Sequence, residues 1–298
     1  MKGLHQLLSS VSRSFYLSMR FLPREMRPGV AVGYLLARAT DTVADTVDMD
    51  CRERLALLKM MGETVAGDAS RETASSCFGK LGVLSSVQPH RGEAELLARF
   101  PECLALLEAL PPREQMLVRQ VLSTIVEGQA WDLEYFEDHS SVSCPEQLEH
   151  YAYMVAGCVG EFWTRLGLLV LRADFSTQPE EQLLRWGMHY GMGLQLVNIL
   201  RDREEDLSRG RSYLPAADVE PWLDRAERWL KEGVFYAESL RNGRLRFSTV
   251  LPAWLGLDTL DLLKRRELPA KGGKVKVTRG AVYSRMWKAF LFSWKEAL

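Results

Sequence analysis

The sequence lacks the marks of several common classes of protein. Its five cysteines are scattered, without a CxxC pair or a histidine spacing suited to zinc, so we expect free thiols in a reducing cytoplasm. A formal net charge of -1 lacks the basic excess of nucleic-acid-binding proteins, which argues against a nucleic-acid partner. No stretch reads as a membrane span of about 18 to 20 apolar residues, and polar residues interrupt the amino terminus where a signal peptide would be apolar.

The sequence also lacks the sustained alternation of apolar and polar residues that would predict a sheet. Apolar residues recur at spacings of three and four, which is typical of helices. With 298 residues, 47% of them hydrophobic, the chain can bury a large core, and we expect one all-α domain over residues 1–298. Capping boxes at Ser143–Glu146 and Thr177–Glu180 predict two helix starts. Gly67–Glu95, rich in Ser, Gly and Thr, is expected to be a connecting loop with one short helix.

What the chain does have is two pairs of aspartates at the same spacing. Asp41 and Asp45 lie in DTVADTVD, and Asp202 and Asp206 lie in ILRDREED. In a helix, residues four apart share one face, so each pair can present its carboxylates to one ion or ion cluster. Either pair alone could equally be a solvated face with ordinary ion pairs. Two copies in separate apolar helices favour a magnesium clamp, with the helices facing each other across a cavity.

Polar neighbours extend each pair along its helix. At about 100° per residue, Tyr34 and Arg38 share the stripe of the first pair, and Gln195 and Asn198 share that of the second. Both stripes enter otherwise apolar sequence, where polar groups need partners. A diphosphate substrate would be repelled by carboxylates alone, so bound magnesium would have to bridge the two.

Four blocks of this sequence resemble the head-to-head trans-prenyltransferases, the family of squalene, dehydrosqualene and phytoene synthases. The first two blocks are SRSFYLSMRFLP from Ser12 and GYLLARATDTVAD from Gly33. The third is YAYMVAGCVGEFW from Tyr151, and the fourth is GLQLVNILRDREEDLSRGRSYLP from Gly193. The resemblance covers most of residues 9–215. It implies an isoprenoid-synthase-type helical bundle around a central cavity, with two molecules of farnesyl diphosphate as substrate.

The resemblance also assigns roles to individual residues. Tyr151 matches the motif tyrosine placed near the leaving diphosphate, and it joins the four aspartates as a catalytic residue. The magnesium ligands it implies are Asp41, Asp45, Asn198, Asp202 and Asp206. The diphosphate contacts it implies are Ser12, Arg13, Arg38, Gln195, Asn198, Arg201 and Arg211. For Arg201, an ion pair with Glu204 or Glu205 remains the alternative.

An allylic cation formed in such a reaction must be kept from water, which requires an apolar cavity. We expect Phe15, Tyr34 and Phe162 to line it, although core packing is an equal alternative for Phe15 and Phe162. The motif glycines Gly157, Gly160, Gly191 and Gly193 would allow helices to bend or pack closely.

Members of the family differ in the last step of the reaction, which in squalene synthases is a reduction by NADPH. KGGKVKVTRGAVYSRM is similar to the basic segment near the nicotinamide site of squalene synthases, which makes Lys271, Lys274, Lys276 and Arg279 candidates for binding NADPH. A solvated basic loop is the alternative. Ala44 departs from the acid common in squalene synthases.

The leading hypothesis is a bacterial-type squalene synthase that uses magnesium and NADPH. The alternatives are a dehydrosqualene, phytoene or presqualene diphosphate synthase, a non-catalytic or head-to-tail relative, and a helical interaction module.

The carboxyl-terminal segment AVYSRMWKAFLFSWKEAL is amphipathic. It places Met286, Trp287, Phe290, Leu291 and Trp294 together, with lysines between them. Packing on the domain is the favoured use of this surface, and docking on a membrane is the alternative. We therefore expect a cytoplasmic protein, with peripheral contact at the inner membrane face left open. The sequence does not predict an oligomeric state.

Overall fold

The computed structural model describes residues 2–12, 19–215, 219–265, 275 and 277–294, and of Lys2–His5 only the backbone. Every named element in these ranges is a helix, and β structure is limited to the isolated bridges Ser141–Ser212 and Ser176–Leu240. The all-α prediction is confirmed.

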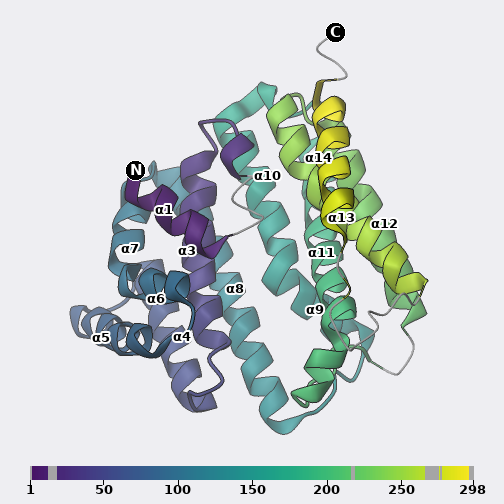
Figure 1. Ribbon diagram of the computed structural model, residues 1–298. Helices are drawn as coiled ribbons and strands as arrows, with labels where there is room; N and C mark the ends of the chain where they lie inside the picture. The colour runs from purple at the N-terminus through teal and green to yellow at the C-terminus, as the bar shows by residue number, and fades with distance from the viewer. Residues whose placement is uncertain (1, 13–18, 216–218, 266–274, 276, 295–298) are drawn as a thin grey trace. The chain divides into compact units, whose positions relative to one another are not determined.

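The described chain divides into two compact units, drawn with the rest in Figure 1. The first comprises residues 1–20 and 24–137, and the second comprises residues 21–23 and 138–298. Each unit has its own contacts and is described by itself. A single domain over residues 1–298 stays a prediction.

The first unit consists of helices joined by short turns. They are α1 (Lys2–Val11), α3 (Arg27–Ala44), α4 (Cys51–Ala66), α5 (Arg71–Val87), α6 (Arg91–Ala98), α7 (Phe100–Glu108) and α8 (Pro112–Asp138). Helix α3 packs against α4, α6 and α7, and α5 packs against α6. This arrangement brings α6 beside the first aspartate pair.

The expectation of a connecting loop at Gly67–Glu95 is wrong, because α5 and most of α6 occupy this stretch. Gly67 ends α4 with a φ of 88°, and the Ser70 side chain then caps α5 by accepting a hydrogen bond from the Thr73 amide at 3.1 Å. Helix α5 buries Cys77, Leu81 and Leu84, a spacing of four and three. Burial of this apolar stripe outweighs the low helix propensity of its serines and glycines.

The second unit also consists of helices. They are α9 (Pro145–Ala152), the π-helix η1 (Tyr153–Gly157), α10 (Cys158–Leu171), the 3-10 turn η2 (Arg172–Asp174), α11 (Glu180–Ser208), α12 (Glu220–Ser239), α13 (Gly243–Lys264) and α14 (Arg279–Trp294). Helix α11 packs against α10, α12 and α13, and α14 packs against α13 (Figure 1).

The two expected capping boxes form differently from the prediction. Helix α9 begins at Pro145, and the amide and hydroxyl of Ser143 both donate to Gln147 Oε1, at 3.1 and 2.7 Å, so Gln147 replaces Glu146 as the partner. Helix α11 begins after Pro179 without a side-chain cap. The helix starts were therefore predicted correctly to within a few residues, but their cap contacts were not.

Glycines allow α10 and α11 to pack backbone against backbone. A Cβ added to Gly160 would lie 1.8 Å from the Gly187 carbonyl oxygen, and one added to Gly191 would lie 2.2 Å from the Ala156 oxygen. Gly160 in the third sequence block and Gly191 just before the fourth therefore serve close helix packing.

The run Pro145–Asp174 is long and apolar enough, by length and composition, to cross a membrane. This corrects the expectation that no stretch reaches that size. The core helices of soluble proteins meet the same criterion, and this run includes α10, which packs on α11.

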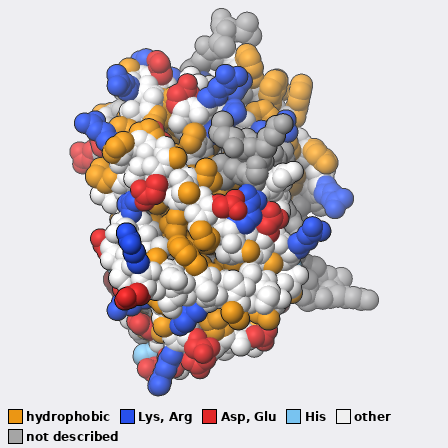
Figure 2. Space-filling model, turned by 90° about the vertical axis from the view of Figure 1, so that its left-hand side faces the viewer, with side chains coloured by type: hydrophobic (Ala, Val, Ile, Leu, Met, Phe, Trp, Pro, Cys, Tyr) orange, Lys and Arg blue, Asp and Glu red, His pale blue; other side chains and the backbone are white. Residues whose placement is uncertain are grey.

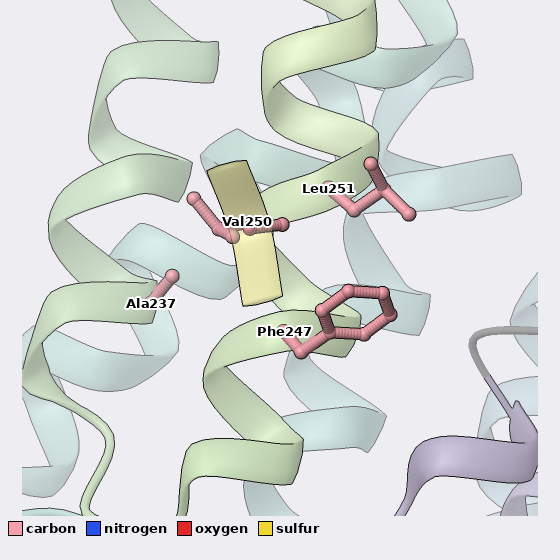
Figure 3. Close-up of a cluster of buried hydrophobic side chains, with 5 residues drawn as sticks. Ala237, Phe247, Val250 and Leu251 are labelled. Carbon is pink, nitrogen blue, oxygen red and sulfur yellow. The ribbon is translucent and has the colours of Figure 1, made fainter. Parts of the chain in front are cut away.

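A hydrophobic cluster joins the last three helices of the second unit. It contains Ala237 from α12, Phe247, Val250 and Leu251 from α13, and Ala289 from α14 (Figure 3). Met286 and Phe292 of α14 pack against it. One side of α14 is therefore part of the core. On the face drawn in Figure 2, hydrophobic side chains are exposed among acidic and basic ones.

Candidate active site

Helix α3 carries the first set of predicted site residues. The Asp45 amide, at the carboxyl end of the helix, donates to the Asp41 carbonyl oxygen at 2.9 Å. This bond places the two aspartates one turn apart, as the four-residue spacing predicts. Tyr34 and Arg38 precede them on the same helix.

Arg38 links this face to α6. Its guanidinium forms one ion pair with Asp41 and a second with Glu93, in the first turn of α6. The Nε atom of Arg38 is buried and has no hydrogen-bond partner among the described residues. The two ion pairs fix the Arg38 guanidinium beside the aspartate pair, where an arginine can contact a phosphate bound there.

Glu93 was not among the predicted site residues. It lies 55 residues from Arg38 in the sequence, inside the stretch expected to be a loop. No motif marks it, so only the fold of α6 against α3 could reveal the contact.

The environment of Asp41 favours the uptake of a cation. Burial first, and then the negative charge of Asp45, raise the pKa of Asp41, while Arg38 opposes the rise. The Asp41 side chain is still 42% exposed, so a hydrated ion can reach it. Magnesium is bound in proteins by one or two carboxylates together with water and phosphate oxygens. Asp41 and Asp45 fit that ligand set.

Tyr34 and Ser12 lie close to the end of α1. The Tyr34 hydroxyl donates to the Val11 carbonyl oxygen at 3.1 Å, and burial raises the pKa of Tyr34. Ser12 is 3% exposed, and its hydroxyl donates to the Leu8 carbonyl oxygen at 2.5 Å. Their predicted contacts with substrate stay predictions. Arg13 and Phe15 lie outside the described residues.

Helix α11 carries the second set. Arg201 donates to both carboxylate oxygens of Asp202, with Nε–Oδ1 at 3.0 Å and Nη2–Oδ2 at 2.6 Å. The alternative expected for Arg201 was an ion pair with Glu204 or Glu205, but the partner is Asp202, and Glu205 pairs with Arg209. Arg201 therefore forms an ion pair with an aspartate of its own helix, as Arg38 does with Asp41.

Gln195 and Asn198 precede this ion pair on α11. The Asn198 amide donates to Gln195 Oε1 at a long 3.5 Å. Asn198 is exposed, Gln195 is half-buried, and the Asp202 side chain is 20% exposed. Their amide and carboxylate oxygens are therefore accessible ligands on one helix face.

The chain that leaves α11 folds back toward α9. Gly210 turns it with a φ of 77°, and the Arg211 amide donates to the Asp206 carbonyl oxygen at 2.9 Å. The Val142 amide then donates to the Ser212 carbonyl oxygen at 2.8 Å, which anchors the return. The third and fourth sequence blocks, which carry Tyr151 and Arg211, thus meet within the second unit.

Tyr213 packs on the predicted catalytic tyrosine. The rings of Tyr151 and Tyr213 stack with centroids 5.2 Å apart and planes inclined by 20°. Tyr151 is 9% exposed. Tyr213 was not predicted as a site residue, although it lies in the quoted block GRSYLP. The stack restricts the orientation of Tyr151.

The remaining predicted residues are only partly covered by the structure. Phe162, on α10, is 7% exposed, which is compatible with core packing. Arg279 is exposed at the start of α14. Lys271, Lys274 and Lys276 lie outside the described residues, so the NADPH site stays a prediction.

Neither aspartate pair is a complete metal site by itself. No group of three or more His, Cys, Asp or Glu side chains that could hold a metal ion occurs in the part of the chain that the structure describes. Each pair would need water, a substrate or further ligands to complete the coordination. That both pairs serve one cluster of magnesium ions stays a prediction.

Comparison with known proteins identifies relatives of the chain. The family model described as squalene/phytoene synthase matches residues 8–221. The squalene synthase ERG9 of Candida albicans is 29% identical over 215 residues, covering 71% of this chain and 44% of that protein. The chain thus spans less than half the length of this curated relative.

Two solved structures share the fold. One, described as TcSQS in complex with the ligand E5700, has a TM-score of 0.73 at 22% identity and covers 98% of this chain and 88% of its own. The other, a dehydrosqualene synthase in complex with a ligand, has a TM-score of 0.65 at 18% identity and covers 98% of this chain and 95% of its own.

Proposed function

Because this chain belongs to the squalene/phytoene synthase family, we propose that it is a prenyltransferase that joins two molecules of farnesyl diphosphate head to head. In its finer form the proposal is a squalene synthase, which passes through presqualene diphosphate and ends with reduction by NADPH. The family description also names phytoene synthases, so an enzyme that ends without reduction is the second candidate.

The observation that carries the proposal is the arrangement around Asp41. Two carboxylates lie one turn apart, burial and the charge of Asp45 raise the pKa of Asp41, and Arg38 is held beside them. Together these features suit a cation that holds a diphosphate. A cation bound between Asp41 and Asp45 would offset the repulsion between their charges. Helix α11 likewise carries an arginine, Arg201, paired with an aspartate of the second pair, Asp202.

Each residue then has a task that follows from its chemistry. Asp41, Asp45, Asp202 and Asp206 would hold magnesium, assisted by Asn198, and Arg38 and Arg201 would bind the diphosphate oxygens. Magnesium, when bound, neutralises the charge that develops on the leaving diphosphate. Arg38 and Arg201 are already held by carboxylates, so little side-chain entropy is lost when a phosphate binds.

Tyr151 would act near the leaving group. Its hydroxyl can donate a hydrogen bond to a diphosphate oxygen or pass a proton, and Tyr213 holds the ring in place. The buried apolar residues of α10 and α11 would keep water from the reacting carbon atoms. Lys271, Lys274, Lys276 and Arg279 are proposed to bind the phosphates of NADPH.

The deciding experiment is a product assay. The protein is incubated with labelled farnesyl diphosphate and magnesium, with and without NADPH, and the extracted lipids are identified. Squalene that appears only with NADPH supports the finer proposal. Dehydrosqualene in both tubes supports the second candidate and eliminates the first, and unchanged substrate in every tube refutes the prenyltransferase.

Two substitutions test the aspartate pairs separately. Asp41→Asn and Asp202→Asn each keep the size of the side chain and remove one charge from a proposed metal ligand. We expect each to abolish turnover while the helical circular dichroism is unchanged. Asp174→Asn, in the 3-10 turn η2, is the matched control and should keep full activity. Full activity in either ligand variant would refute the role proposed for that pair.

A further inference from the structure

Helix α14 presents a continuous apolar surface away from the core. Five of its side chains are exposed although they are large and hydrophobic: Tyr283, Trp287, Phe290, Leu291 and Trp294. We call these five residues the α14 stripe. At about 100° per residue they fall within roughly 100° of the helix circumference. The opposite side, with Ala289 and Met286, packs on the core.

Side chains of the α14 stripe contact one another, and the stripe holds a large share of the exposed hydrophobic side chains. Trp287 stacks on Phe290 with ring centroids 5.9 Å apart, and Phe290 lies 5.9 Å from Trp294. The exposed large hydrophobic side chains of the described residues number thirteen, and five of them lie on this one helix of 16 residues. In Figure 2, hydrophobic side chains also project at the upper right-hand edge, with basic side chains close by. Scattered exposure needs no explanation, but a contiguous aromatic surface does.

The charged side chains of α14 itself are all basic. Helix α14 contains Arg279, Arg285 and Lys288 and no acidic residue. Arg279 and Lys288 are exposed and lie on the two sides of the stripe by helix position. Arg285 is instead neutralised, because it donates to Asp258 of α13 at 2.7 Å.

Basic residues also outnumber acidic ones in the carboxyl-terminal part of the sequence as a whole. Residues 264–298 contain ten Lys and Arg against two Glu, a net charge of +8, whereas residues 1–263 carry -9. The near-neutral total of -1 therefore hides a strongly basic segment that includes the aromatic stripe. An anionic surface would attract this segment and not the rest of the chain.

We propose that the α14 stripe docks on the surface of an anionic lipid bilayer, with the helix lying in the plane of the interface. Tryptophan and tyrosine favour this boundary because the ring is apolar while the N–H or O–H group stays hydrated. Flanking Lys and Arg side chains reach the lipid phosphates. The core-facing side of α14 stays packed, so docking requires no unfolding.

A second copy of the chain is a poorer occupant of the same surface. A symmetric dimer through the α14 stripe would bring the exposed Arg279 and Lys288 of one copy close to those of the other, and like charges oppose such an interface. A bilayer that contains anionic lipid removes that repulsion and covers the aromatic rings at the same time. The proposal is independent of the reaction that the protein catalyses.

The test is flotation of the full chain with lipid vesicles. One set contains phosphatidylcholine alone, and the other contains phosphatidylcholine mixed with phosphatidylglycerol. We expect binding to the mixed vesicles to be at least about tenfold tighter than to the neutral ones, and to weaken as salt is added. Failure of the unaltered protein to bind mixed vesicles at low salt would overturn the proposal.

Variants separate the apolar and electrostatic contributions. The double variant Trp287→Ser/Leu291→Ser should bind both kinds of vesicle at least about tenfold more weakly. Lys288→Gln should lose about fivefold on the mixed vesicles and nothing on the neutral ones. The matched control is Val83→Ser/Val87→Ser, which removes two exposed hydrophobic side chains from α5 and should bind like the unaltered protein.

Two further measurements keep the outcomes distinct. Sedimentation without lipid should give the same mass for the unaltered protein and the double variant. If the unaltered protein is instead a dimer and the double variant is a monomer, the stripe binds a second copy and the proposal is overturned. Equal vesicle binding by the double variant would also overturn it. Turnover of detergent-dispersed substrate should not change in the double variant, so loss of docking and loss of catalysis are distinguishable.

Discussion

Replacing Gly160 by alanine tests whether backbone contact between α10 and α11 is needed in the second unit. The added Cβ would lie 1.8 Å from the Gly187 carbonyl oxygen and 2.4 Å from its carbonyl carbon. Real Cβ contacts below 3.0 Å essentially do not occur, so the helices must separate by about 1.2 Å at this point. The obstacle is backbone on a packed helix, which cannot move aside as a flexible side chain could.

The size of the effect follows from two opposing contributions. Overpacking of a core typically costs about 1 to 3 kcal/mol, and a clash with backbone lies at the upper end of that range. Alanine in place of glycine inside a helix contributes about 0.5 to 1 kcal/mol in the other direction. We therefore expect the free energy of unfolding of Gly160→Ala to fall by about 2 kcal/mol.

The measurement is urea unfolding followed by circular dichroism, with Gly79→Ala and Gly82→Ala as controls. Both control glycines lie in α5 and have nothing within 4 Å of an added Cβ, so these variants should be as stable as the unaltered protein or more so. Turnover of Gly160→Ala should fall as well, because displacements of about 1 Å can cost about 100-fold in rate. A Gly160→Ala variant as stable as the controls would refute the close-packing argument.

Three other substitutions or conditions give further predictions. Glu93→Gln removes one of the two negative charges that hold Arg38, so the affinity for magnesium diphosphate, measured by calorimetry, should weaken by about three- to tenfold. The midpoint of unfolding should stay within the error. An unchanged affinity would contradict this prediction. Burial and the charge of Asp45 raise the pKa of Asp41 from 3.8 to about 7. Between these two pH values the folded protein therefore holds a proton on Asp41 that the unfolded chain has lost. Stability without metal should therefore decline as the pH rises from about 4 to about 7, and the stabilisation by magnesium should grow over the same range; an Asp41→Asn variant with the same pH profile would exclude this carboxyl as the cause. Tyr213→Leu removes the ring stacked on Tyr151 and should lower turnover more than Tyr213→Phe, which keeps the stack; equal losses would mean that the hydroxyl matters and the stack does not.

The sequence was most informative where a structural property depends on neighbouring residues. The three-and-four periodicity predicted helices, and the four-residue spacing of Asp41 and Asp45 predicted one shared face, because both follow from the pitch of a helix. The charge of residues 264–298 is likewise a property of the sequence alone. Motif similarity predicted the family that comparison with known proteins then confirmed.

Local reasoning failed where packing outweighed propensity. Residues 71–87 contain serines and glycines that weaken a helix, yet α5 forms because Leu81 and Leu84 are buried on one side of it. The amphipathic carboxyl-terminal segment was expected to pack mainly on the domain. One side of it does so, through Met286, Ala289 and Phe292, while the α14 stripe remains exposed.

Only the tertiary structure decided which side chains meet. Glu93 reaches Arg38 across 55 residues of sequence, and Tyr213 reaches Tyr151 because Gly210 turns the chain back toward α9. Such contacts depend on loop closure and on the packing of whole helices, which no short window of sequence contains. The sequence by itself determined the helices and the faces that carry charge, and the packing of those helices determined the partners of each charge.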